Sequence, residues 1–286
     1  MLTSGITRIE NHLHALIGER NLNTSPEWLQ QCADYITNRF RGSRLVVRRE
    51  AVPFDTRSSD NILGRKEGSD QGSNPFILAA HYDTVEGSPG ADDNASAVAV
   101  LLETAHCLQA VPLRIPLTFA AFSLEESGFM GSHHHITEAR KRNEGFHGMI
   151  SLEMVGYRDH QPGSQSYPVY VDSSRYPDTG DFLAVVGNEP SAKLTNAVAR
   201  GMRDAAPALP VEQLIVPGRG DEFTEVRLSD HSPFWEHGIP AVMITDTAFF
   251  RNPNYHQASD TLDTLDLEFI CNTAQAVTGF LKHHLS

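Results

Sequence analysis

Short apolar runs, each followed by polar residues, constrain the fold of this chain more than any other feature. The run 76–80 is followed by His81, the run 117–124 by Glu125 and Glu126, and the run 148–152 by Glu153. Unbroken apolar runs of this length are typical of strands buried on both faces of a sheet. Because ligands gather at the carboxyl ends of strands in open α/β sheets, we expect these polar side chains to meet in space.

Segments between and around these runs predict the rest of the architecture. Helical patterns cover 6–18, 25–40, 95–109, 131–141, 191–204 and 267–284. Further strands are expected at 45–53, 61–65, 182–186 and 239–245, with loops at 55–60 and 157–179 and a Pro- and Gly-rich stretch at 207–220. Strands that alternate with helices imply crossover connections. The pattern predicts an α/β fold, a three-layer sandwich with a mixed, mainly parallel central sheet flanked by helices.

Composition excludes several classes of protein. A formal charge of −13 without runs of Lys or Arg argues against a nucleic-acid partner. The three cysteines, Cys32, Cys107 and Cys271, include no CxxC pair, so we expect core thiols and no disulfide framework. The chain has neither a signal-peptide pattern nor an uncharged apolar stretch of transmembrane length, which predicts a cytoplasmic protein that does not bind membranes. A secreted protein whose signal peptide had been removed would show the same sequence features.

The polar residues supply the ligands that zinc takes in hydrolases, imidazole nitrogen and carboxylate oxygen. The candidates are His81, Asp93, Glu126, Glu153 and His256. Asp93 lies in the turn sequence 90–96 just before a helical segment, and we interpret it as the bridge between two ions. Asp83 follows His81 by two residues and can accept the ring N–H that is not needed for metal.

Glu125 and Glu126 are adjacent, so they would point different ways from a strand end. That arrangement suits one metal ligand and one general base. Two divalent ions, three ligand carboxylates and a bridging hydroxide sum to near neutrality, which leaves Glu125 as a fourth carboxylate beside the ions. Our hypothesis is that Glu125 takes the proton of the attacking water and later gives it to the leaving amine.

Three ordered segments resemble the M28 metallopeptidases, a family that contains bacterial dizinc aminopeptidases. The first combines residues 81–85 with 90–96, the second is 123–128 with its Glu-Glu pair, and the third is 254–261 around the last histidine. The similarity extends over about residues 60–270. Because the candidate site residues extend from His81 to His256 with no clear linker between them, we expect one metallopeptidase domain over 1–286, in which 1–58 supply the N-terminal helices and the first strand and 60–270 form the metal-site core.

The resemblance also implies a role for each residue. Asp93 would bridge two zinc ions, His81 and Glu153 would complete one site, and Glu126 and His256 would complete the other. Glu125 would be the base. Tyr255 matches a position whose phenol stabilises the oxyanion in some members. Glu153 stands where many members have Asp, and its longer side chain still allows ligation.

These implications predict a zinc-dependent exopeptidase that removes the N-terminal residue of a peptide by means of a metal-bridging hydroxide. Surplus acid near the metals would hold the free α-ammonium of the peptide substrate. A glutaminyl cyclase with one zinc and a non-catalytic binding member of the same fold are alternatives. Carboxypeptidase action would need a cationic clamp, for which Arg219, Arg227 and Arg251 are candidates.

Some residues have two interpretations at this point. His231 resembles a family segment near the pocket, but helix capping by Ser229 or Asp230 explains the same sequence. The aromatic residues Phe234, Phe249, Phe250 and Tyr255 either line an apolar substrate pocket or belong to the core. The tract 133–135 of three histidines is interpreted as a solvated turn and is excluded from the site.

Overall fold

A single mixed sheet runs through the computed structural model, which describes residues 2–70 and 72–286, with side chains from residue 4 onward. Its strand order is β1-β2-β4-β3-β5-β8-β6-β7. The strands are β1 (Val46–Phe54), β2 (Arg57–Lys66), β3 (Phe76–His81), β4 (Leu117–Phe122), β5 (Gly148–Glu153), β6 (Leu183–Asn188), β7 (Val211–Val216) and β8 (Ala241–Thr245). Neighbours in the block β4-β3-β5-β8 are parallel, as are β6 and β7, and the other neighbours are antiparallel. The mixed, mainly parallel sheet is therefore confirmed.

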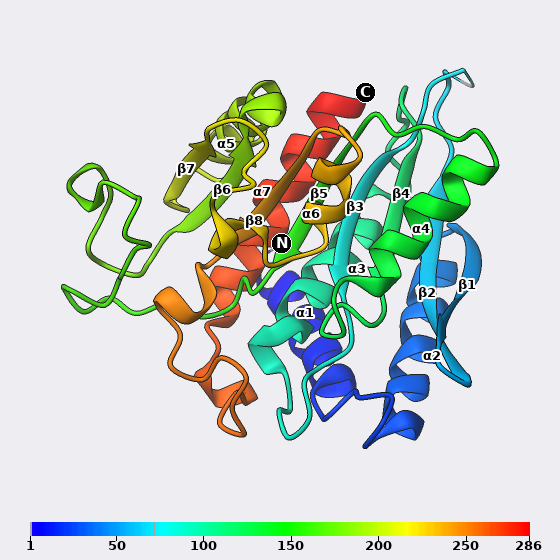
Figure 1. Cartoon of the computed structure of the whole chain (residues 1–286), viewed down its shortest axis with the longest axis horizontal. Coiled ribbons are helices and arrows are strands. Elements are labelled where there is room, and N and C mark those ends of the chain that lie inside the picture. The colour runs from blue at the N-terminus through cyan, green and yellow to red at the C-terminus, as the bar shows by residue number, and fades with distance from the viewer. Residues whose placement is uncertain (1, 71) are drawn as a thin grey trace.

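Helices cover both faces of this sheet (Figure 1). On one face lie α1 (Leu2–Leu16), α2 (Pro26–Gly42), α3 (Ala97–Leu108), α5 (Ala192–Ala205) and α7 (Leu267–Leu285), and on the other lie α4 (Met130–Lys141) and α6 (His231–Glu236). A hydrophobic core lies on each face of the sheet, and successive side chains of β3 point into alternate cores. Phe76 and Leu78 pack under the larger group of helices, whereas Ile77 and Ala79 pack on the face covered by α4 and α6. The three-layer α/β sandwich is confirmed. The expected domain range 1–286 includes residues 1 and 71, which lie outside the described residues.

The β1–β2 hairpin corrects the loop expected at 55–60. Antiparallel pairing begins directly at Phe54 and Arg57, so only Asp55 and Thr56 form the turn. Asp55 has φ of 50°, the left-handed conformation that such short turns use. Residues 57–60 are polar and their helix and strand propensities are weak, but pairing with β1 makes them a strand. Because β2 runs antiparallel to β4, the start of β2 and the hairpin tip lie at the edge of the sheet where β3, β4 and β5 end.

The Pro- and Gly-rich stretch 207–220 contains a strand that the sequence did not predict. Strand β7 lies between Pro210 and Pro217 and pairs in parallel with β6 at the edge of the sheet. Proline cannot donate a hydrogen bond to a neighbouring strand, so the prolines before and after this six-residue segment argued against a strand in the sequence.

The tract of histidines corrects another expectation. Residues 133–135 lie in α4, within the helix expected at 131–141, but the tract is not solvated throughout as expected. His135 is buried, and its Nδ1 is 3.0 Å from Oε1 of Glu50 in β1. The pair ties α4 to the hairpin, away from the site described below.

The three cysteines, all of which lie within the described residues, form no disulfide bond with one another. Cys32 and Cys271 are buried, but Cys107 is exposed, so the expectation of a core thiol is wrong at that position. In the part of the chain that the structure describes, none of the helices is both long and apolar enough to cross a membrane.

Candidate metal centre

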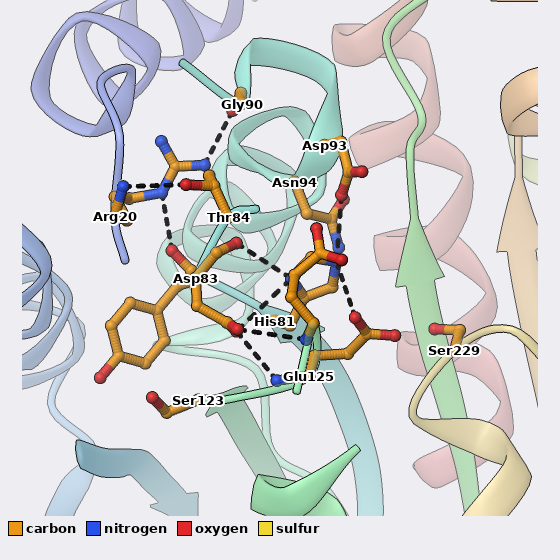
Figure 2. Close-up of polar contacts among 12 residues, drawn as sticks. Arg20, His81, Asp83, Thr84, Gly90, Asp93, Asn94, Ser123, Glu125 and Ser229 are labelled. Carbon is orange, nitrogen blue, oxygen red and sulfur yellow. Dashed lines mark hydrogen bonds and ion pairs between the residues drawn. The ribbon is translucent and has the colours of Figure 1, made fainter. Parts of the chain in front are cut away.

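The predicted ligands come from separate segments that end at one edge of the sheet. His81 is the last residue of β3, and Glu153 is the last residue of β5. Glu125 and Glu126 follow β4, Asp93 lies in an irregular turn (Ala91–Ser96) before α3, and His256 lies in the loop between β8 and α7. Figure 2 shows the side chains of His81, Asp93 and Glu125 turned toward one another. Parallel strand order thus gathers residues that are far apart in sequence.

The ligand atoms form two groups that share Asp93. In the first, His81 Nε2 lies 3.3 Å from Asp93 Oδ1 and 3.4 Å from Glu153 Oε1. In the second, His256 Nε2 lies 3.2 Å from Asp93 Oδ2 and 3.2 Å from Glu126 Oε2. Each group has ligand atoms close enough to hold one ion, and a third such group, overlapping these, joins His81, Glu125 and Glu126.

These separations fit zinc. Two ligand atoms placed about 2.0 to 2.1 Å from a tetrahedral zinc ion lie roughly 3.3 Å apart. In addition, Asp93 Oδ1 and Glu126 Oε1 are buried, and among the described residues neither oxygen has a partner in hydrogen-bonding geometry, although His81 Nε2 lies 3.3 Å from Asp93 Oδ1. Buried carboxylate oxygens normally have a partner, because leaving them without one is costly. The donor set therefore fits two ions that share the carboxylate of Asp93.

The pKa values of the clustered side chains also indicate that the site needs cations. Burial raises the pKa of Glu126 to about 7 and raises the pKa of Glu125 well above its usual value, with further increases from neighbouring carboxylates. Burial alone would lower the pKa of His256, but hydrogen bonds to Asp93 and Glu126 raise it to about 10. Buried carboxylates in such number require cations beside them, either protons or metal ions.

Backbone contacts hold Asp93 in place. The carboxylate of Asp260 accepts hydrogen bonds from the backbone N–H groups of Asp92 and Asp93, at 2.8 and 3.1 Å. The next residue, Asn94, donates its side-chain amide to Leu152 O in β5 and accepts from the backbone N–H of Met154. Asn94 and Asp260 were not predicted as site residues, although both lie in the segments that resemble the M28 family.

Asp83 lies between His81 and the glutamate pair. The Nδ1 atom of His81 is 3.2 Å from the backbone oxygen of Asp83 and 3.7 Å from its Oδ1. The two carboxylate oxygens accept the backbone N–H groups of Glu125 and Glu126, at 3.1 and 3.2 Å. Asp83 therefore orients the Glu-Glu loop in addition to facing the ring of His81 (Figure 2).

Ser229 has a role that helix capping does not explain. Neither Ser229 nor Asp230 caps α6 through its side chain. The hydroxyl of Ser229 instead donates a 2.7 Å hydrogen bond to Oε2 of Glu153. His231 is fully buried in α6 with Nε2 2.8 Å from Val226 O, and burial lowers its pKa to about 4. His231 thus belongs to the packing of α6.

Arg20, which the sequence did not single out, is buried beside this centre. Its guanidinium donates to the backbone oxygens of Leu16, Gly18, Tyr82, Pro89 and Gly90. These contacts join the end of α1 to the loop 82–90 that connects His81 with Asp93 (Figure 2). Gly90 has φ of 62°, and an added Cβ would lie 2.6 Å from the Arg20 guanidinium, so the loop closes tightly around this residue. An isolated arginine between two helical patterns gives no sequence signal for such a role.

A cavity of about 360 Å³ opens beside the ligands. Asp93, Glu125, Glu126, Glu153 and His256 form its polar end. Its walls are mainly apolar: Tyr167, Pro168, Val171, Tyr176, Phe182, Ala184, Val186, Leu214, Val226, Met243, Phe249, Phe250 and Tyr255 are among them. Phe249, Phe250 and Tyr255 thus line a pocket, whereas Phe234 is fully buried in the core. The ring of Tyr255 also stacks on that of His256, at 3.8 Å between centroids.

The long loop expected at 157–179 is irregular, as predicted, and extends at the left of Figure 1. Its Tyr167, Val171 and Tyr176 nevertheless form part of the cavity wall. The sequence missed this function because loop composition does not indicate where a loop folds back. The tyrosines, which are unusual in a purely solvated loop, were the available signal.

Comparisons with known proteins identify the family of this chain. A family model for peptidase family M28 matches residues 61–281. The uncharacterised protein YfbL of Escherichia coli (strain K12) is 37% identical over 88% of this chain and 79% of its own length. Aminopeptidase YwaD of Bacillus subtilis (strain 168) is 30% identical over 83% of this chain, which spans 48% of that relative.

Solved structures share the fold at lower identity. The LapA aminopeptidase of Legionella pneumophila has a TM-score of 0.76 and 20% identity, covering 100% of this chain and 75% of that one. Glutaminyl cyclase of Porphyromonas gingivalis has a TM-score of 0.74 and 18% identity, covering 100% of this chain and 99% of that one. The fold alone is therefore common to peptidases and cyclases. The sequence matches decide the family, and the chain belongs to peptidase family M28.

Proposed function

We propose that this protein is a dinuclear zinc aminopeptidase that releases the N-terminal residue of peptides. The main support is the pair of ligand groups sharing Asp93 at distances that suit tetrahedral zinc, with Glu125 beside them. Zinc in such a site supplies Lewis acidity toward a carbonyl oxygen and lowers the pKa of water. The chain's own residues then have to bind the substrate and move protons.

Glu125 is the proton carrier in this proposal. It lines the cavity, and its burial raises its pKa well above the usual value, which favours its role as a group that accepts and returns a proton. Glu125 takes the proton of the attacking water and delivers it to the amine that leaves. Tyr255 lines the same cavity, and burial raises its pKa, so its phenol stays protonated and can donate to the oxyanion.

The cavity favours an N-terminal residue over a C-terminal one. Acidic side chains at its polar end can hold an α-ammonium, and none of the described residues lining it is Lys or Arg. The three arginines considered for a carboxylate clamp lie elsewhere. Arg219 and Arg227 pair with Asp221 at the surface, and Arg251 packs over the ring of Phe182 with its Nη1 on Phe182 O. The apolar walls suit a large apolar first side chain.

Mass spectrometry of peptide products tests the proposal. The zinc-loaded protein is incubated with a Leu-initiated peptide, its N-acetylated form and a Gln-initiated peptide, with Glu125→Gln protein as the inactive control. We expect loss of the first residue from the free peptide alone. Loss of ammonia from the Gln peptide without residue release would identify a cyclase, and an absence of any product would favour a binding protein.

A further inference from the structure

A second cavity, of about 170 Å³, adjoins the metal centre. Glu126 lines both cavities, so the two meet at this candidate ligand. The second cavity is formed by Asn21, Leu22, Asn23, Phe54, Asp83, Thr84, Val85, Glu86, Leu124, Glu126 and Ser127. Asn23, Glu86 and Ser127 are exposed, so this cavity opens to solvent.

The position of the second cavity fits the part of a peptide that follows the scissile bond. This assignment rests on the proposed aminopeptidase function. If the first side chain occupies the apolar cavity, the reacting carbonyl would lie at the ligands and the next residue would continue past Glu126, which lines both cavities. An open cavity there allows the rest of the peptide to extend into solvent.

One wall of this cavity comes from segments before residue 61, where the match to the family begins. Asn21 donates its side-chain amide to Thr84 O at 3.0 Å, which fixes the α1–α2 loop against the loop after β3. Arg57, at the start of β2, donates to Leu22 O at 2.6 Å and to the side chain of Asn23. The hairpin and the α1–α2 loop therefore form one braced wall, and Arg57 itself is not among the lining residues.

The lining combines apolar surface with carboxylates. Leu22, Phe54 and Leu124 provide apolar contacts. The carboxylate of Asp83 is engaged by the Glu-Glu loop, and that of Glu126 faces His256. Glu86 is exposed at the rim and has no ion pair or hydrogen bond with any described residue. A side chain with an apolar stem and a cationic head fits both features.

We propose that the second cavity binds the second residue of the substrate and that Glu86 selects arginine or lysine there. An exposed ion pair contributes modestly, so we expect kcat/KM to be about three to ten times higher for an Arg than for a Glu in the second position. Salt at high concentration should reduce this ratio, because it screens exposed charges.

Peptides that differ only in the second residue test this proposal. The set is Leu-Arg, Leu-Ala and Leu-Glu at the N-terminus of one common sequence, with kcat/KM measured for each. Glu86→Gln should bring the Arg-to-Glu ratio close to one, and Glu86→Lys should invert it. Glu268→Gln, which removes an exposed carboxylate outside both cavities, should keep the wild-type ratio.

The outcomes separate the two proposals. Wild-type protein that releases leucine from all three peptides at equal kcat/KM refutes the assignment of the second cavity but leaves the aminopeptidase intact. A Glu86→Lys protein that still prefers Arg over Glu in the second position also refutes the assignment of the second cavity and leaves the aminopeptidase intact. Wild-type protein that releases leucine from none of them refutes the aminopeptidase itself.

Discussion

Ser229 donates a 2.7 Å hydrogen bond to Oε2 of Glu153. The bond directs the other oxygen, Oε1, toward the ring of His81 at 3.4 Å. A partner of this kind orients a ligand and increases metal affinity, and its loss commonly weakens binding by about 10- to 100-fold. The longer glutamate side chain therefore has a specific contact that restrains it.

Ser229→Ala should accordingly bind zinc about tenfold more weakly at the Glu153 site while remaining folded. Competition with a chromophoric chelator measures the affinity. Ser174→Ala, in an exposed loop, is the matched control. Equal zinc affinity in the Ser229→Ala protein and the control would show that the hydrogen bond does not restrain the ligand.

Glu125→Gln should lower kcat by roughly 10²- to 10⁴-fold, because the amide cannot accept the proton of water. Its zinc content should stay at the wild-type value, since Glu125 is assigned as the base and not as a ligand. Steady-state kinetics and elemental analysis on the same preparation check both parts. Near-normal kcat would contradict the assignment of the base.

Arg20→Met should destabilise the fold by at least about 3 kcal/mol, because it leaves several buried carbonyl groups without donors. Chemical denaturation measures the free energy of unfolding. Arg41→Met is the control, since Arg41 is exposed at the end of α2. If the two variants unfold at the same denaturant concentration, Arg20 does not brace the loop between His81 and Asp93.

His12 should make stability depend on pH. Burial lowers its pKa from 6.5 to about 4 in the folded protein. The unfolded chain therefore binds more protons between these values, and stability falls as the pH decreases from 6.5 to 4, by up to about 3 kcal/mol. In His12→Gln that part of the slope should disappear, whereas the exposed His14→Gln should retain it. If the free energy of unfolding depends on pH in the same way in wild type and in His12→Gln between pH 4 and 6.5, the prediction is wrong.

The central part of the fold was predictable because its signals are local. The runs ending at His81 and Glu153 are buried strands in the structure, and their polar ends meet as parallel pairing requires. Strand β7 and the start of β2 were missed because pairing with a neighbour, and not local propensity, makes them strands. Arg20 and the second cavity depend on contacts between distant segments, which no single stretch of sequence reveals.

The amount of zinc bound per chain tests the dinuclear centre most directly. Wild-type protein is reconstituted with zinc, freed of loosely bound metal and analysed for its elements, alongside His256→Ala. We predict two zinc ions per wild-type chain and one in His256→Ala, because among the ligand groups of the described residues His256 belongs to the second and not to the first. One ion or none in the wild-type protein would contradict a dinuclear centre bridged by Asp93.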